Sequence, residues 1–240
     1  MLKGIGAAGV VGLAGCIGGG GSRTIQQGVL MPLTGDLGNL GAPIRDGAIL
    51  PAAELEGETE FTFDIQEEDT ETNAQAGISG AESLVNNGFP AVTGAASSGV
   101  TMQVAQQVLI PNGTVGCSPA STSPAVTGLD DDDFYFRTCP SDALQGQVIA
   151  QVGAEQLGNG TAATMYVNND YGQALSQSFA STFENEHGGE VAAQVSFEQE
   201  QNSYSSQIET ALEDEPEMLV VIGYPASGIT LFRDYYSDYD

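Results

Sequence analysis

Hydrophobic and polar positions follow two alternating patterns along the chain. Short apolar runs bounded by turn residues are typical of strands, and the longer segments between them repeat their apolar positions at helical spacing. We expect strands at residues 25–32, 60–66, 90–94, 114–117, 134–138, 162–167, 191–197 and 218–222. We expect helices over 42–56, 72–87, 100–110, 143–157, 173–186, 205–213 and from 226 onward. This strict alternation with short connections predicts an α/β fold with parallel sheets flanked by helices.

The alternation divides into two series, one ending at Cys117 and the other starting at Ala162. The linking segment DDDDFYFRTCPSDA, residues 130–143, is itself a strand running into a helix cap. Two sheets with a strand-like crossing between them fit this order better than one sheet. We therefore expect two lobes, an N-terminal lobe over 25–138 and a C-terminal lobe over 139–240.

The first residues have the pattern of an export signal. A charged start at Lys3 precedes an apolar stretch over 5–14 and a small-residue processing site, which predicts a signal peptide over 1–15. The segment GIGAAG at 4–9 fits the glycine spacing of a dinucleotide-binding loop, but no strand precedes it, so this match carries no function. We expect no cofactor.

The segment LAGC at 13–16 resembles the lipobox of prokaryotic lipoprotein signal peptides. The resemblance implies cleavage before Cys16 and attachment of lipid to its sulfur. The glycine-rich stretch that follows, within 16–24, is typical of a flexible tether. We expect a protein anchored by lipid to the extracellular face of the cytoplasmic membrane.

The charge balance is strongly acidic, with 32 Asp and Glu against 5 Lys and Arg and a formal net charge of −27. This excludes generic nucleic-acid binding and docking on anionic lipid by charge alone. The apolar fraction of 41% still predicts a folded chain. Molar salt would screen the repulsion, because the Debye length is then about 3 Å. The composition is similar to that of proteins from salt-loving archaea, so we interpret the acidic surface as a solvent adaptation.

Three smaller features, an acidic run, two cysteines and two glycosylation patterns, each allow a functional and a purely structural interpretation. The run at 130–133 lacks the spaced ligands and turning glycine of a calcium loop, so we expect a solvated loop and no metal site. Cys117 and Cys139 do not have zinc-site spacing. An oxidising location allows a disulfide between them, and two unpaired cysteines are an equal alternative. Asn112 and Asn159 match the N-glycosylation pattern, which often occurs by chance.

The candidate chemistry lies in loops after the first strands. TGDLGNLG at 34–41, GAASSG at 94–99 and CSPASTSP at 117–124 all follow predicted strands. Ligands of open parallel sheets gather at the carboxyl ends of strands. Ser98 is placed to cap the helix that follows, and that helix start offers N–H groups to a carboxylate. Composition leaves open whether the serines hold a small anionic group or only cap the helix.

An ordered set of segments resembles the branched-chain amino-acid-binding family, the type I periplasmic solute-binding proteins of ABC importers. The segments are IQQGVLMPLTGDLGNLG, GAASSGVTMQVAQ, CSPASTSPAVTG, DFYFRTCPSDALQG, YVNNDYGQALSQSF and YSSQIETALEDEPEMLVVIGYPASG. The resemblance implies a two-lobed fold that closes on an amino acid or related small amide. It also implies a monomer that delivers its ligand to ABC permease and ATPase subunits and performs no chemistry.

The resemblance also implies roles for individual positions. Ser98 matches the serine that binds the ligand carboxylate, and Ala120 and Thr122 fall where family members bind the ammonium and carboxylate groups. Leu40 replaces an aromatic residue often seen in the first loop. The other expected contacts are Ser97, Ser121, Tyr171, Gly223 and Tyr224. The family's acidic partner for the ammonium falls past Asp240, so we expect the second lobe to be incomplete in this sequence.

Two other functions compete with this interpretation. AASSG at 95–99 fits a loose form of the hydrolase nucleophile elbow. A triad also needs a histidine, and His187, the only one, falls in a turn at the opposite end of the sheet. The second alternative is a sensor ectodomain, since the same fold serves receptors. A lipid anchor with no transmembrane helix after it argues against that alternative.

Overall fold

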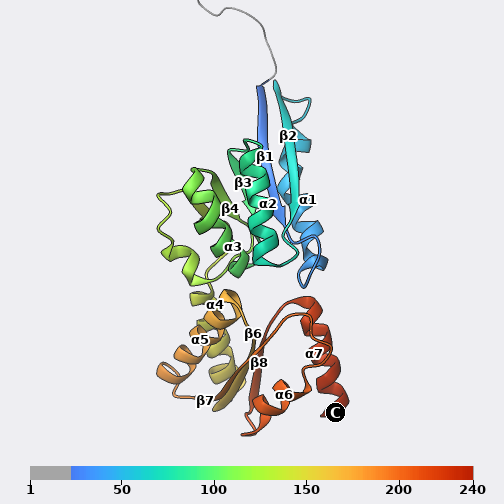
Figure 1. Cartoon of the computed structure of the whole chain (residues 1–240). Helices are drawn as coiled ribbons and strands as arrows, with labels where there is room; N and C mark the ends of the chain where they lie inside the picture. Colours follow the sequence, from blue (N-terminus) through green and yellow to red (C-terminus); the bar gives the residue numbers. More distant parts are fainter. Residues whose placement is uncertain (1–22, 240) are drawn as a thin grey trace, which may run out of the picture.

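The computed structural model describes residues 23–239. The expected signal peptide, Cys16 and most of the tether lie outside the described residues. The described part forms two lobes, one above the other in Figure 1. No helix within residues 23–239 combines the length and the apolar character needed to cross a bilayer.

The first lobe is built on a five-stranded parallel sheet with the order β2-β1-β3-β4-β5. Gly28 of β1 pairs with Gln66 of β2 on one side and with Val92 of β3 on the other. The strands are β1 (Arg23–Met31), β2 (Phe61–Asp69), β3 (Ala91–Gly94), β4 (Val115–Ser118) and β5 (Tyr135–Arg137). All five strands were expected from the apolar runs, and β2 extends three residues further than its pattern indicated.

The helices of the first lobe are α1 (Gly38–Leu55), α2 (Ala74–Asn86) and α3 (Ser98–Val104). The last continues into a π-helical turn, Ala105–Leu109, and a 3-10 turn, Ile110–Asn112; a further 3-10 turn spans Pro124–Gly128. The prediction that α1 begins at residue 42 was wrong. A Cβ on Gly41 would lie 1.7 Å from the carbonyl oxygen of Pro32, so this glycine allows a close approach of helix to strand end rather than marking a loop.

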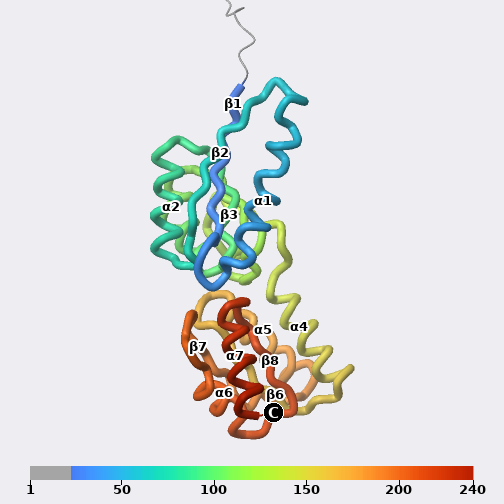
Figure 2. Tube along the Cα trace, turned by 90° about the vertical axis from the view of Figure 1, so that its right-hand side faces the viewer, coloured from blue at the N-terminus to red at the C-terminus, as the bar shows by residue number. Residues whose placement is uncertain are grey.

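The second lobe has a three-stranded parallel sheet with the order β7-β6-β8. Its strands are β6 (Thr161–Val167), β7 (Glu190–Phe197) and β8 (Met218–Ile222). Its helices are α4 (Asp142–Gln151), which continues into a π-helical turn at Val152–Gln156, α5 (Asp170–Asn185), α6 (Ser205–Leu212) and α7 (Pro225–Asp238). Figure 2 shows the chain passing from the upper to the lower lobe through α4, which packs against α5.

Each lobe has its own hydrophobic core. In the first, Leu30, Leu84 and Leu109 are fully buried between the sheet and α2 and α3. In the second, Phe179 and Met165 are fully buried in two clusters on the sheet. Leu37, which precedes α1 in the first lobe, packs into the cluster of the second lobe that contains Met165. Otherwise the clusters are confined to one lobe each, which leaves the surface between the lobes available for a site.

The two cysteines of the described region lie close to the crossing between the lobes. Cys117 is in β4 and Cys139 follows β5, and both are half-buried free thiols in the structure. Burial raises the pKa of each thiol. Of the two alternatives that the sequence left open, the structure therefore has the unpaired one.

Candidate functional site

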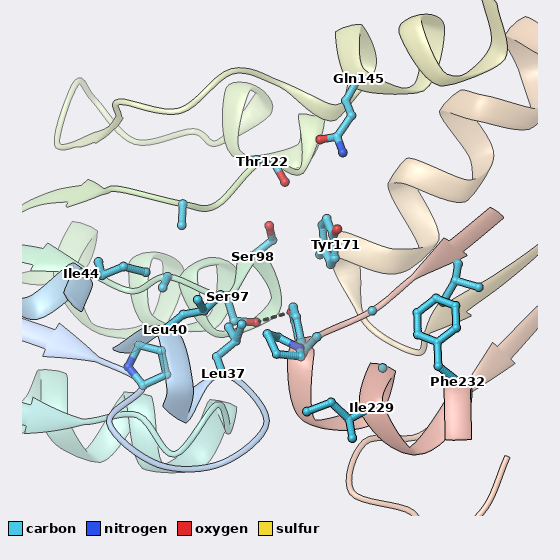
Figure 3. A pocket seen from close by; sticks show the side chains of 18 residues that line it. Leu37, Leu40, Ile44, Ser97, Ser98, Thr122, Gln145, Tyr171, Ile229 and Phe232 are labelled. Atoms are coloured by element: carbon cyan, nitrogen blue, oxygen red, sulfur yellow. Dashed lines mark hydrogen bonds between the residues drawn. The ribbon is translucent and has the colours of Figure 1, made fainter. Parts of the chain in front are cut away.

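A cleft of about 840 Å³ lies between the two lobes (Figure 3). The first lobe supplies residues that follow the carboxyl ends of β1, β3 and β4, and the second supplies residues that follow β6 and β8. All of the expected ligand contacts except Ser121 line this cleft, namely Leu40, Ser97, Ser98, Ala120, Thr122, Tyr171, Gly223 and Tyr224.

Ser121 is fully buried beneath the loop that carries its neighbours. Its hydroxyl lies 2.6 Å from that of Thr101 and donates to the carbonyl oxygens of Ala95 and Ala96. The expectation that it contacts ligand is therefore not met by its position. Alternate residues of this extended loop face opposite sides, so Ser121 holds the loop against α3 while Ala120 and Thr122 face the cleft.

Ser98 does not cap a helix, contrary to the sequence prediction. It is the first residue of α3, and Ser97 occupies the cap position without a capping hydrogen bond. The Ser98 oxygen instead accepts a hydrogen bond from the Ser123 backbone N–H at 3.2 Å. Within residues 23–239 this is its one side-chain hydrogen bond, so the Ser98 hydroxyl hydrogen is free to donate into the cleft.

Ser97 joins the lobes. Its hydroxyl lies 2.9 Å from the hydroxyl of Tyr224, which also accepts from the side-chain amide of Asn169 at 3.1 Å. Asn169 is in turn the N-cap of α5, where its side-chain oxygen accepts the backbone N–H groups of Tyr171 and Gly172 at 3.1 Å. One asparagine thus positions both cleft tyrosines.

Tyr171 and Tyr224 stack, with ring centroids 5.6 Å apart and an interplanar angle of 10°. Burial raises the pKa of Tyr171 to about 12, and the charge of Asp142 adds to this. Burial also raises the pKa of Tyr224. Both phenols are therefore neutral near pH 7, so they offer the cleft apolar ring faces and uncharged hydroxyls.

Thr122 is another hydroxyl-bearing residue that lines the cleft. Its hydroxyl donates to one carboxylate oxygen of Asp142 at 2.8 Å, and the Asp142 backbone N–H donates to its carbonyl oxygen, also at 2.8 Å. Asp142 itself is fully buried behind the cleft. Figure 3 shows Thr122, Ser98, Tyr171 and Gln145 gathered on one side.

The remaining sides of the cleft are apolar. Leu40 and Ile44 come from α1, and Ile229 and Phe232 come from α7 (Figure 3). The sequence analysis identified Leu40 only. Ile44, Ile229 and Phe232 lie three or four residues from another apolar residue on the same helix. That spacing predicts a buried helix face, but it does not tell whether the face lines a cleft or belongs to the hydrophobic core.

No charged side chain belongs to the described residues that line the cleft. His187 lies in the turn between α5 and β7, 3.5 Å from Glu155, at the amino end of the strand rather than at the cleft. Nor do residues 23–239 contain a group of three or more His, Cys, Asp or Glu side chains placed to hold a metal ion. The arrangement therefore has the features of a binding cleft with a polar side and an apolar wall.

Comparison with known proteins agrees with this geometry. The family model described as "Periplasmic binding protein" matches residues 24–237. The chain belongs to this family. Its relatives and structural neighbours are binding proteins of the type I class, as the segments resembling the branched-chain amino-acid-binding family implied.

Two relatives illustrate the match. A substrate-binding protein of a chemotactic signal transduction system, BasB of Halobacterium salinarum, is 30% identical over 217 residues, which are 85% of this chain and 51% of that protein. A Leu/Ile/Val-binding protein homolog of Brucella melitensis is 30% identical over 166 residues, 65% of this chain and 42% of that protein. The chain thus spans about half the length of these relatives.

Solved structures share the fold. The leucine-binding protein LivK of Thermotoga maritima superposes with a TM-score of 0.75 at 26% identity, covering 83% of this chain and 56% of its own. A solute-binding protein of R. palustris in complex with benzoate gives a TM-score of 0.78 at 16% identity, covering 89% and 59%.

Proposed function

We propose that this chain belongs to an extracytoplasmic solute-binding protein that holds a small amino acid with a branched-chain-like apolar side chain between its lobes. The observation that carries the proposal is the two-sided cleft. The Ser98 hydroxyl is free to donate to a carboxylate, while Leu40, Ile44 and Phe232 offer an apolar wall to a side chain. Neutral Tyr171 and Tyr224 fit a ligand without net charge. A related small amide would satisfy the same groups.

Membership of the family supports a proposal for the cellular role. We propose that the protein delivers its ligand to the permease and ATPase subunits of an ABC importer, acting as a monomer without a cofactor. Lipid on Cys16 would hold it at the extracellular face of the cytoplasmic membrane, with residues 16–24 as a tether after removal of 1–15. The net charge of −27 suits a salt-loving archaeon, where molar salt screens repulsion.

Ligand-dependent unfolding tests the binding function. The full chain is melted in molar KCl with leucine, isoleucine, valine, urea, short amides and aromatic acids. A ligand at about 100 times its dissociation constant stabilises the fold by about 2.7 kcal/mol, which is a clear shift of the melting temperature. A shift with a branched-chain amino acid supports the proposal. A cooperative melt that no compound of the panel shifts would overturn it.

The anchor is tested separately from binding. A Cys16→Ser variant expressed in a haloarchaeal host should move from the membrane fraction to the medium. A Cys117→Ser variant is the matched control and should remain with the membrane. Equal fractionation of the two variants would contradict lipidation at Cys16.

A signalling role is the second candidate, because the Halobacterium relative that matches 85% of this chain is named for a chemotactic system. In that case the liganded protein would contact a membrane transducer instead of a permease. Cells lacking the protein distinguish the two roles. Loss of labelled-ligand uptake indicates the importer, whereas loss of attraction with uptake intact indicates the signalling system.

A further inference from the structure

We infer that Asn112 and Asn159 are N-glycosylation sites, each taking an oligosaccharide on its side-chain amide nitrogen. Both asparagines stand in the tripeptide Asn-Gly-Thr, at 112–114 and at 159–161. This tripeptide fits the acceptor pattern, in which serine or threonine follows the asparagine by two positions. The inference rests on the proposed extracellular location and goes beyond the proposed binding function.

The first step is the place of the two tripeptides in the fold. Asn112 ends a 3-10 turn and leads into the amino end of β4, and Asn159 follows a π-helical turn and leads into the amino end of β6. The cleft is instead lined by residues that follow the carboxyl ends of strands. Because the strands of each sheet are parallel, both tripeptides lie at the end of their sheet that is remote from the cleft. Sugars there would leave the cleft open to its ligand.

The second step is that the two amide nitrogens can carry a sugar. Asn112 is exposed, and its side-chain amide donates to the carbonyl oxygen of Val108 at 2.7 Å. Glycosylation replaces one of the two amide hydrogens, so the second remains for Val108. Asn159 is half-buried and is held by its backbone N–H, which donates to the carbonyl oxygen of Gly153 at 3.0 Å. Its side chain makes no hydrogen bond within residues 23–239.

The third step separates the acceptor pattern from an ordinary turn. Another Asn-Gly pair, Asn87-Gly88, also joins a helix to a strand, between α2 and β3. Gly88 and Gly113 both have left-handed backbones, with φ of 84° and 62°, which glycine adopts readily. The change of chain direction at a helix end therefore explains an Asn-Gly pair by itself. The residue after the glycine is what distinguishes the acceptor tripeptides.

That residue is Phe89 after the first pair and Thr114 after Asn112, and each is only 5% exposed. The Thr114 hydroxyl forms no hydrogen bond to another residue of the described part of the chain. Packing alone would favour an apolar side chain at this position, since a buried hydroxyl without a partner is costly. The acceptor pattern accounts for the hydroxyl. Thr161 also serves the fold, because its hydroxyl accepts the backbone N–H of Glu217 at 3.1 Å.

The proposed reaction uses an oligosaccharide linked through phosphate to a membrane lipid as its donor. The asparagine nitrogen bonds to the anomeric carbon of the first sugar, and the bond from that carbon to the phosphate oxygen breaks. The lipid phosphate leaves with the electron pair, and one amide proton passes to a base of the transferase. The product carries a bulky, solubilising group at the protein surface.

Peptide mass spectrometry of the full chain, expressed in a haloarchaeal host, tests both sites. Cleavage after Glu155 places the two tripeptides in different peptides. We expect each peptide to carry the added mass of an oligosaccharide. Asn112→Gln should remove it from the first peptide only, and Asn159→Gln from the second only. Asn87→Gln changes the Asn-Gly pair that has no threonine after it and should leave both peptides unchanged.

Substitutions of Thr114 distinguish glycosylation from a structural role of the loop. Thr114→Ser keeps the acceptor pattern and should keep the sugar on Asn112. Thr114→Val has nearly the same shape and should lose the sugar. Both variants should show the same ligand-induced shift of the melting temperature as the native chain, because the tripeptide lies away from the cleft.

An exported chain whose two peptides have only the polypeptide mass would overturn the inference alone. An added mass on the first peptide that persists in both Asn112→Gln and Thr114→Val would overturn it as well. Recovery of the chain from the cytoplasm with residues 1–15 still attached would overturn the proposed extracellular location, and the inference with it. The fraction that contains the chain and its amino-terminal residue distinguish these failures.

Discussion

The carboxylate of Asp36 in the first lobe accepts a hydrogen bond from the backbone N–H of Ser227 in the second lobe at 2.8 Å, and its other oxygen accepts the Ser227 hydroxyl. Both residues are buried. Ser227 lies in the first turn of α7, where the backbone N–H groups and the helix dipole favour a negative charge. This contact and the bond between Ser97 and Tyr224 join the lobes directly.

Removal of the Asp36 carboxylate should weaken lobe closure. Asp36→Ala leaves the N–H and hydroxyl of Ser227 without their acceptor, a loss of about 1.5–3 kcal/mol for hydrogen bonds to a charged group. We expect a larger radius of gyration by small-angle X-ray scattering in molar KCl, because the open arrangement becomes populated. Asp130→Ala, at an exposed position, is the control. Identical scattering from Asp36→Ala and the native chain would contradict a closing role.

Ser98 should contribute to affinity through its free hydroxyl hydrogen. Replacement of a hydrogen bond to a ligand carboxylate costs about 1.5–3 kcal/mol, so Ser98→Ala should weaken leucine binding about 10- to 100-fold. Titration calorimetry on the folded variant measures this directly. Ser79→Ala, an exposed serine on α2, should bind like the native chain. An affinity of Ser98→Ala within twofold of native would remove Ser98 from the site.

Two helical glycines should respond oppositely to alanine. Gly172 follows Tyr171 in α5, and a Cβ there would lie 2.1 Å from the carbonyl oxygen of Val167. Overpacking of this kind costs about 1–3 kcal/mol, so Gly172→Ala should lower the melting temperature and displace Tyr171. Gly47 in α1 has open space around its Cβ position, and Gly47→Ala should stabilise by up to about 1 kcal/mol. Equal shifts of the two melting temperatures would show that the close contact between Gly172 and Val167 does not affect stability.

The sequence predicted the parts of this architecture that depend on local pattern. The apolar run at Met218–Ile222 is β8 with the predicted bounds, and the loops after β3 and β4 carry Ser98 and Thr122 to the cleft as expected from strand order. These predictions hold because strand burial and the polarity of strand-end loops are encoded within a few neighbouring residues.

The parts that escaped prediction depend on distant partners. Asp36 and Ser227 are 191 residues apart, and neither stands in a distinctive motif. Asp142 was interpreted only as part of a helix cap, because burial of its carboxylate against Thr122 follows from the packing of the crossing segment. Phe232 has the spacing of a core residue, and only the arrangement of the two lobes turns it toward the cleft.

Acid should abolish the contribution of Asp69 to the free energy of unfolding. Asp69 is the last residue of β2, and its carboxylate accepts hydrogen bonds from the loop that leads to Asp36. Its carboxylate accepts the backbone N–H groups of Leu33 and Glu71 at 2.8 Å and the Thr34 hydroxyl at 2.7 Å. Burial would raise the pKa of Asp69, but these hydrogen bonds outweigh it and hold the pKa below its ordinary value. An aspartate whose pKa is lower in the folded than in the unfolded chain stabilises the fold above the unfolded pKa of about 3.9.

That stabilisation is lost as the pH falls through the lower, folded-state pKa. Asp69→Asn should therefore unfold more easily than the native chain at pH 7 and at pH 5. The difference in stability should narrow as the pH falls below the unfolded-state pKa, because the unfolded native chain then takes up a proton that the folded chain still excludes. Denaturant titrations at constant molar KCl measure the gap at each pH. The exposed Asp130→Asn variant corrects for the general loss of carboxylate repulsion in acid. A gap that stays constant from pH 7 to pH 3 would show that the charge on Asp69 does not hold the loop.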